Sequence, residues 1–107
     1  MSGTSADGVD AVAADISGEP SVRVKLLAHV HLTFPAALRR SILDAAVAGS
    51  VAELCRLNFV LGERFGEAAA AVIQAAKLGI SDVAVIGSHG QTFHHLPNGR
   101  PPSTLQL

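Results

Sequence analysis

The chain has few of the features that mark secreted, membrane or nucleic-acid-binding proteins. Its 107 residues include one cysteine, Cys55, so an internal disulfide cannot form. Charged residues make up 16% and the formal net charge is −1, which does not favour nucleic acid or an acidic membrane surface. No run approaches the ~18 apolar residues of a membrane span. Met1 leads into small polar residues, unlike a secretory signal. These absences predict a cytoplasmic protein.

The remaining composition is that of a folded chain. Hydrophobic residues account for 49% of the sequence, which argues against disorder. The length fits one domain or part of one. Cys55 lies in an amphipathic segment, which predicts a thiol in the core.

Residues 1–10 concentrate glycine, hydroxyl and aspartate side chains in one short stretch. Glycine lets the backbone approach a ligand closely, and Asp7-Gly8 is typical of a hairpin turn when strands flank it. Hydroxyls and exposed N–H groups in such a turn form a donor surface that suits an anion, most often a phosphate. The alternative interpretation is a polar turn or a frayed terminus without a ligand.

Two strands are predicted after this stretch. Residues 9–16 are small and apolar, and residues 17–21 supply a turn. In residues 22–34 every even position is apolar, whereas the other face is largely polar. Period-two alternation predicts a half-buried strand, antiparallel to the first.

Two helices are predicted next. Pro35 suits the first turn of a helix that ends at Gly49, and Ser50 with Glu53 matches a capping box. Apolar residues then keep a 3.6-residue period to Lys77. Within the second helix, small residues lie four apart, at Gly62, Gly66 and Ala70. Because internal glycines cost helix stability, this stripe predicts close packing against the sheet or another helix.

The last third predicts three strands. Val83–Ile86 is an uninterrupted apolar run, the pattern of a strand buried on both faces. Residues 91–95 and 103–107 are two further strands, joined across 96–99. Together the elements predict an α/β layer structure.

A second polar block, Ser88–Thr92, follows the carboxyl end of the apolar run, where open α/β sheets usually bind ligands. His89, Gln91 and Thr92 could hydrogen-bond sugar hydroxyls or an acetamido group. A turn whose polar groups satisfy one another is the alternative. A metal site at His89, His94 and His95 is disfavoured, because adjacent strand residues point to opposite faces.

Both blocks resemble one protein family. Met1–Asp10, and Ile86–Thr92 followed by His95, Pro97 and Thr104–Gln106, are similar to the anhydro-N-acetylmuramic acid kinases of the sugar kinase/Hsp70/actin superfamily. The resemblance covers the whole chain. It implies a partial actin-like ATPase (ribonuclease H-like) domain with a mixed β-sheet and packed helices. Residues 1–107 would be its N-terminal part, without the family's first strand and second domain.

The resemblance also implies a reaction: ATP-dependent phosphorylation of 1,6-anhydro-N-acetylmuramic acid with hydrolytic opening of the anhydro ring, in murein recycling. ATP and Mg²⁺ are the implied cofactors, and a homodimer is the implied assembly of the full-length protein. The ATP-binding loop would comprise Gly3, Thr4, Ser5, Ala6, Asp7, Gly8, Val9 and Asp10. Within it, Asp7 is the candidate for Mg²⁺, and Asp10 would also act through water.

For the sugar, the resemblance implies contacts from His89, Gln91 and Thr92 in an interdomain cleft. The general base is expected beyond Leu107, so the isolated chain is expected to be inactive. Two alternatives stay open. One is a half-domain of another kinase or ATPase of the superfamily. The other is a non-catalytic α/β fragment that needs a partner or dimerises through exposed sheet edges.

Overall fold

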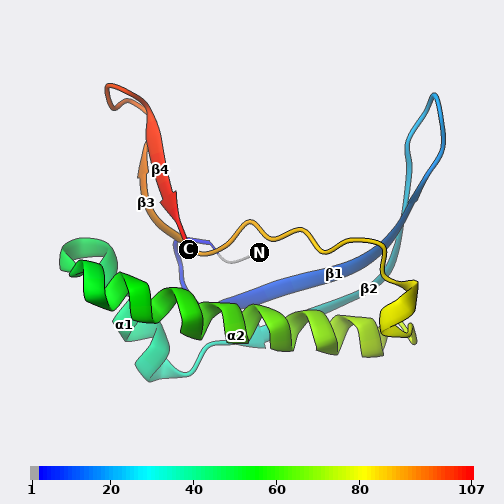
Figure 1. Cartoon of the computed structure of the whole chain (residues 1–107), viewed down its shortest axis with the longest axis horizontal. Helices are drawn as coiled ribbons and strands as arrows, with labels where there is room; N and C mark the ends of the chain where they lie inside the picture. Colours follow the sequence, from blue (N-terminus) through cyan, green and yellow to red (C-terminus); the bar gives the residue numbers. More distant parts are fainter. Residues whose placement is uncertain (1–2) are drawn as a thin grey trace.

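The computed structural model describes residues 3–107, so Met1 and Ser2 of the first polar stretch lie outside the described residues. The elements in chain order are β1 (Gly8–Ser17), β2 (Arg23–Thr33), α1 (Ala36–Ala48), α2 (Val51–Ala75), the short 3-10 helix η1 (Ile80–Asp82), β3 (Thr92–Leu96) and β4 (Ser103–Gln106). The two hairpins rise near opposite ends of α2, and the segment after η1 runs back along that helix (Figure 1). The mixed α/β composition is confirmed.

The first hairpin confirms the predicted antiparallel pair. β1 and β2 pair from Gly8↔Thr33 to Ser17↔Arg23, with a register shift at Ala13/Ala14. The alternation of burial is only partly as predicted. Leu32 is half-buried, whereas Val24 is 67% exposed. The reason is that the far half of the hairpin extends beyond the helix that covers the near half (Figure 1).

Both predicted helices form, and their sequence signals explain where they begin. The capping box is present, since Ser50 Oγ accepts from the Glu53 N–H and Glu53 Oε2 accepts from the Ser50 N–H. The helix dipole and these bonds stabilise the first turn of α2. One apolar stripe of α2 is buried, at Leu57, Leu61, Ala68 and Val72. It contacts both strands of the first hairpin.

Two predictions about α2 are wrong. Cys55 is exposed, because two residues before Leu57 a side chain lies on nearly the opposite side of the helix. The small-residue stripe does not pack closely either. A Cβ added at Gly62 or Gly66 would meet nothing within 4 Å. These glycines therefore face open space among the described residues.

The predicted buried strand Val83–Ile86 is also wrong. The segment has no strand assignment, and Val85 is 84% exposed. A buried strand needs hydrogen-bonded neighbours, and in residues 3–107 β1 pairs with β2 while β3 pairs with β4. In place of one mixed sheet there are two separate two-stranded antiparallel sheets. The β3–β4 hairpin itself confirms the strands predicted at 91–95 and 103–107.

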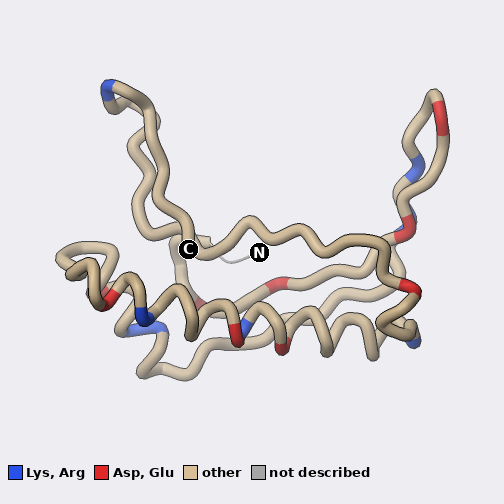
Figure 2. Tube along the Cα trace, viewed as in Figure 1, with Lys and Arg blue, Asp and Glu red and all other residues tan. Residues whose placement is uncertain are grey.

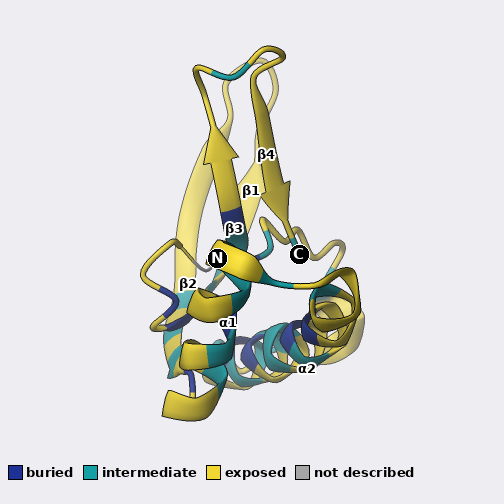
Figure 3. Ribbon diagram, turned by 90° about the vertical axis from the view of Figure 1, so that its left-hand side faces the viewer, coloured by how far each residue is buried: buried dark blue, intermediate teal, exposed yellow. Residues whose placement is uncertain are grey.

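The core lies where the first hairpin, both helices and the base of β3 meet. Its buried residues are Ala6, Val9, Phe34, Ile42, Leu57, Leu61, Ala68 and Phe93. Figure 3 shows this buried interior beside α2 and exposed hairpin ends above it. Lys, Arg, Asp and Glu are interspersed along the trace (Figure 2). In the part of the chain that the structure describes, no helix is both long enough and apolar enough to span a membrane.

Candidate functional site

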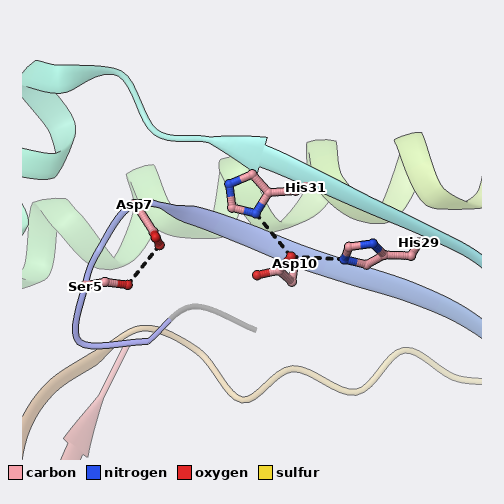
Figure 4. Close-up of polar contacts among 5 residues, drawn as sticks. All are labelled: Ser5, Asp7, Asp10, His29 and His31. Carbon is pink, nitrogen blue, oxygen red and sulfur yellow. Dashed lines mark hydrogen bonds and ion pairs between the residues drawn. The ribbon is translucent and has the colours of Figure 1, made fainter.

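The glycine-rich stretch folds as a tight turn that leads into β1. The Ala6 N–H donates to the Gly3 carbonyl oxygen at 3.1 Å, and Ala6 has a φ of 47°. Ser5 Oγ donates to Asp7 Oδ1 at 2.9 Å (Figure 4). This bond is the main cause that lowers the pKa of the Asp7 carboxyl below its ordinary value, with the N–H of Asp7 next. Gly8 is the first residue of β1 and pairs with Thr33, so in the described residues Asp7-Gly8 leads into a strand and is not itself the turn of a hairpin.

The loop presents some of its predicted residues to solvent and buries others. Gly3, Thr4 and Ser5 are exposed, as are Asp7 and Asp10. The buried members of the block are Ala6, Gly8 and Val9. The exposed members therefore supply the polar surface, while the buried ones anchor the loop.

Gly8 stands where only glycine fits. An added Cβ would collide with the backbone oxygen of Leu32 and lie 2.8 Å from His31 Nε2. The hydrogen bond from the Phe34 N–H to the Asp7 carbonyl, at 2.9 Å, continues the pairing of the hairpin past Gly8. The loop is thus fixed at its second end by the close approach of β2.

Asp10 forms a cluster with two histidines that local sequence reasoning did not connect. Asp10 Oδ1 accepts hydrogen bonds from His29 Nε2 at 3.0 Å and from His31 Nδ1 at 3.1 Å (Figure 4). The bond from His29, followed by that from His31, lowers the pKa of the Asp10 carboxyl. The signal that could have revealed this cluster is the antiparallel pairing of the two strands, because Asp10 lies opposite His31 in the register. The Asp10 carboxylate is therefore held in an exposed polar cluster.

Arg39 brings a positive charge to the loop from α1. Its Nε donates to the Ser5 carbonyl oxygen at 3.2 Å. Nothing in the sequence around Arg39 predicts this contact, because it joins positions 34 residues apart. The guanidinium group lies where it can stabilise both the loop and an anion bound to it.

Gln91 joins the second block to the loop. Its Nε2 donates to the Gly3 carbonyl at 2.8 Å and to the Thr92 carbonyl at 3.1 Å. The side chain has 0% exposure, although the sequence placed it among the sugar contacts. The two polar blocks predicted from the sequence therefore meet in space.

His89 and Thr92 meet at Gln106, a residue to which the sequence assigned no role. Gln106 Nε2 lies 2.9 Å from His89 Nε2 and 3.4 Å from Thr92 Oγ1. His89 Nδ1 lies 3.3 Å from the Gly90 carbonyl, so that nitrogen donates and Nε2 accepts. Thr92 pairs with Gln106 in the β3–β4 register, which is the signal that could have found this contact.

An open cleft of about 420 Å³ lies between α2 and the second block. Its lining residues are Asn58, Gly62, Phe65, Ser88, His89, Gly90, Gln106 and Leu107. Amide, hydroxyl and imidazole groups converge there beside one aromatic ring. Such a combination can bind a small polar molecule with apolar faces. Among residues 3–107, no three histidine, cysteine, aspartate or glutamate side chains are grouped so as to hold a metal ion.

The geometry defines a mixed α/β chain with an anchored glycine-rich loop beside a polar cleft. The family model for anhydro-N-acetylmuramic acid kinase matches residues 1–107, and the chain belongs to this kinase family.

The curated relatives that the chain matches include proteins of three species that carry the name anhydro-N-acetylmuramic acid kinase. The chain is 40% identical over 101 residues to that of Caldanaerobacter subterraneus subsp. tengcongensis, covering 92% of the chain and 26% of the relative. The match to the protein of Vibrio vulnificus strain YJ016 is 38% over 109 residues, covering 100% and 29%. The match to that of Clostridioides difficile strain 630 is 39% over 113 residues, covering 100% and 30%. The chain thus spans between 26% and 30% of these relatives' length.

Proposed function

We propose that the chain supplies the nucleotide-phosphate loop and part of the sugar site of an anhydro-N-acetylmuramic acid kinase. The reaction is ATP-dependent phosphorylation of 1,6-anhydro-N-acetylmuramic acid with hydrolytic opening of the anhydro ring. Its product, N-acetylmuramic acid 6-phosphate, belongs to murein recycling. The observation that supports this proposal is the hydrogen bond that holds the Gly3–Asp10 loop against the Ser88–Thr92 block. Family membership supports the choice of reaction.

The loop carries the proposed role in binding ATP. The exposed residues Gly3, Thr4 and Ser5 offer backbone N–H groups to phosphate oxygens, and Thr4 adds its hydroxyl, since the Ser5 hydroxyl already donates to Asp7. Arg39 adds a cation beside Ser5. Because a phosphoryl group in transfer carries spread negative charge, such positioned donors are the main contribution a protein can make.

The loop can hold Mg²⁺ through an exposed carboxylate. Mg²⁺ commonly keeps several waters and takes one or two carboxylates together with substrate phosphates. The exposed Asp7 carboxylate, whose pKa is lowered, is therefore the proposed residue for a water-mediated contact. When bound, the metal would neutralise charge on the phosphates. Asp10 shares its carboxylate with His29 and His31, so we place it in a supporting role.

The sugar is proposed to bind near the second block. His89 and Thr92 converge on Gln106, and the cleft beside them presents Asn58. Amide and imidazole groups can recognise sugar hydroxyls and an acetamido group, while Phe65 offers an apolar face. Gln91 belongs to the same block, but its buried side chain donates to the Gly3 and Thr92 carbonyls.

The remaining proposals concern the protein as a whole. We propose that residues 1–107 form the N-terminal part of an actin-like kinase domain and that the enzyme acts in the cytoplasm, where ATP is available. We also propose that the full-length protein is a homodimer, which sedimentation at several concentrations would test. Since the general base is expected outside residues 1–107, the isolated chain is proposed to lack turnover.

The first experiment follows backbone amides by NMR while Mg²⁺ and a non-hydrolysable ATP analogue are added to the isotope-labelled chain. Selective shifts of the Thr4, Ser5 and Gly8 amides are expected, with GTP and sulfate as specificity controls. A folded chain whose loop amides stay unchanged would contradict nucleotide binding by this chain. In a parallel assay, release of N-acetylmuramic acid 6-phosphate by the pure chain would contradict the proposed lack of turnover.

A further inference from the structure

Gln91 is the one polar side chain that is fully buried among residues 3–107. Its amide group donates to the carbonyl of Gly3, 88 positions away in the chain, at 2.8 Å. Because the Gln91 side chain is excluded from water, its amide cannot exchange Gly3 for a water molecule, although Gly3 itself is exposed and the bond is partly buried. This makes the Gln91–Gly3 bond a strong local constraint.

The backbone around Gln91 aims the amide inward. Gln91 and Leu107 exchange two main-chain hydrogen bonds, at 2.7 and 3.0 Å. The preceding Gly90 has a φ of 77°, and an added Cβ there would lie 2.5 Å from the Leu107 oxygen. Only glycine accommodates this close approach without strain. The end of β4 and the Gly90 turn therefore fix the direction of the Gln91 side chain.

The accepting group, the Gly3 carbonyl, also closes the loop. It receives the Ala6 N–H at 3.1 Å in addition to the Gln91 amide. One peptide plane is thus held from inside the turn and from the second block. The orientation of this plane decides where the following N–H groups point.

We propose that Gln91 is a positioning residue, which fixes the Gly3 peptide and so sets the conformation of the phosphate loop. Because its side chain is buried, it acts through Gly3 and not by touching the sugar. Gln91 also lies between His89 and Thr92 in the sequence, so it connects the sugar block to the loop. The expected effect of Gln91 on nucleotide binding rests on the proposed function, whereas its effect on the conformation of the loop does not.

The first test needs no nucleotide. In the labelled 107-residue chain, a through-hydrogen-bond scalar coupling is expected between Gln91 Nε2 and the Gly3 carbonyl carbon. In Gln91→Met, which keeps an apolar side chain of similar length, exchange of the Ala6 amide with solvent is expected to rise about tenfold. The matched control is Gln74→Met, at an exposed position of α2.

The second test measures affinity for Mg²⁺ and the ATP analogue. Gln91→Met and Gln91→Glu are expected to bind about tenfold more weakly than wild type, as the loss of the partly buried hydrogen bond to Gly3 implies. Gln74→Met and Gln74→Glu are expected to bind as wild type does. Glutamate places a carboxylate against the Gly3 carbonyl, so its effect should be at least as large as that of methionine.

Each outcome decides a different claim. Absence of the coupling, or unchanged Ala6 exchange in a folded Gln91→Met chain, overturns the positioning role. If the Gln91 variants do not fold, the coupling in the wild-type chain decides the geometry. Equal affinity of Gln91→Met and wild type overturns the role in nucleotide binding while the proposed function stands. If the wild-type chain binds no analogue, the proposed function fails, and the coupling and Ala6 exchange still decide whether Gln91 sets the loop.

Discussion

Arg39 Nε donates to the carbonyl oxygen of Ser5 at 3.2 Å and so connects α1 to the candidate phosphate loop. The contact is exposed, and it leaves the rest of the guanidinium group beside the loop. A planar guanidinium can serve a carbonyl and a phosphate oxygen together, which an ammonium group does less well. The arrangement thus couples loop conformation to local positive charge.

The first prediction is that Arg39→Lys weakens binding of the Mg²⁺–ATP analogue about two- to tenfold, because charge is kept while the forked donor is lost. Calorimetric titration measures the affinity. Arg40→Lys is the matched control, since Arg40 is the neighbouring exposed arginine of α1. Equal affinities of the two variants would show that the Arg39–Ser5 contact does not support binding.

The second prediction concerns Asp10. Its pKa is lowered below the ordinary 3.8 by hydrogen bonds from His29 and then His31. A group with a depressed native pKa contributes stability above its unfolded pKa and loses that contribution as the pH falls through the native value. Carbon NMR of wild type should show that the Asp10 carboxyl titrates with a midpoint below 3.8, because the two histidine hydrogen bonds favour its charged form. In His29→Ala/His31→Ala it should move up toward that value, and an unchanged midpoint would contradict the cluster.

The third prediction tests the capping box of α2. Ser50→Ala should lower the free energy of unfolding by about 1 kcal/mol, since the N–H of Glu53 loses its acceptor. Urea denaturation followed by circular dichroism measures the change. Ser103→Ala, at an exposed position of β4, is the control. A loss no larger than that of the control would mean that the cap contributes nothing measurable.

The fourth prediction contrasts two glycines. Gly8→Ala should destabilise the chain by about 1–3 kcal/mol, because the new methyl group meets the Leu32 backbone and His31. Gly66→Ala should stabilise it by up to about 1 kcal/mol, because its Cβ meets nothing within 4 Å and alanine favours a helix. Thermal unfolding of both variants gives the two signs. Destabilisation by Gly66→Ala would indicate that something covers this face of α2.

Much of the secondary structure follows from local sequence. Alternation at even positions predicted β2, and the 3.6-residue period with Ser50 and Glu53 predicted α2 and its beginning. These signals are reliable because they depend on neighbours within a turn or a pleat. The two polar blocks also stand out in the sequence, since glycine and hydroxyl residues are concentrated in them.

Errors arose where the outcome depends on distant parts of the chain. Cys55 is exposed because contact with the first hairpin decides which face of α2 is buried. An amphipathic pattern identifies the buried stripe of a helix better than it identifies the burial of one residue. Val83–Ile86 has the composition of a buried strand but lies without a strand neighbour in the described residues. A hydrophobic pattern indicates which side chains of a segment can be buried, whereas the neighbouring elements decide whether those side chains are buried.

The sequence by itself determined the helices, the hairpins, the two polar blocks and, through their resemblance, the kinase family that the comparisons confirm. Only the tertiary structure decided how the blocks are joined. The Gln91 amide donates to the Gly3 carbonyl, and Arg39 donates to the Ser5 carbonyl. Asp10 accepts hydrogen bonds from His29 and His31. The physical reason is range. Propensity and capping act over a few residues, whereas a buried hydrogen bond exists only after folding has brought two distant segments together and excluded water from between them.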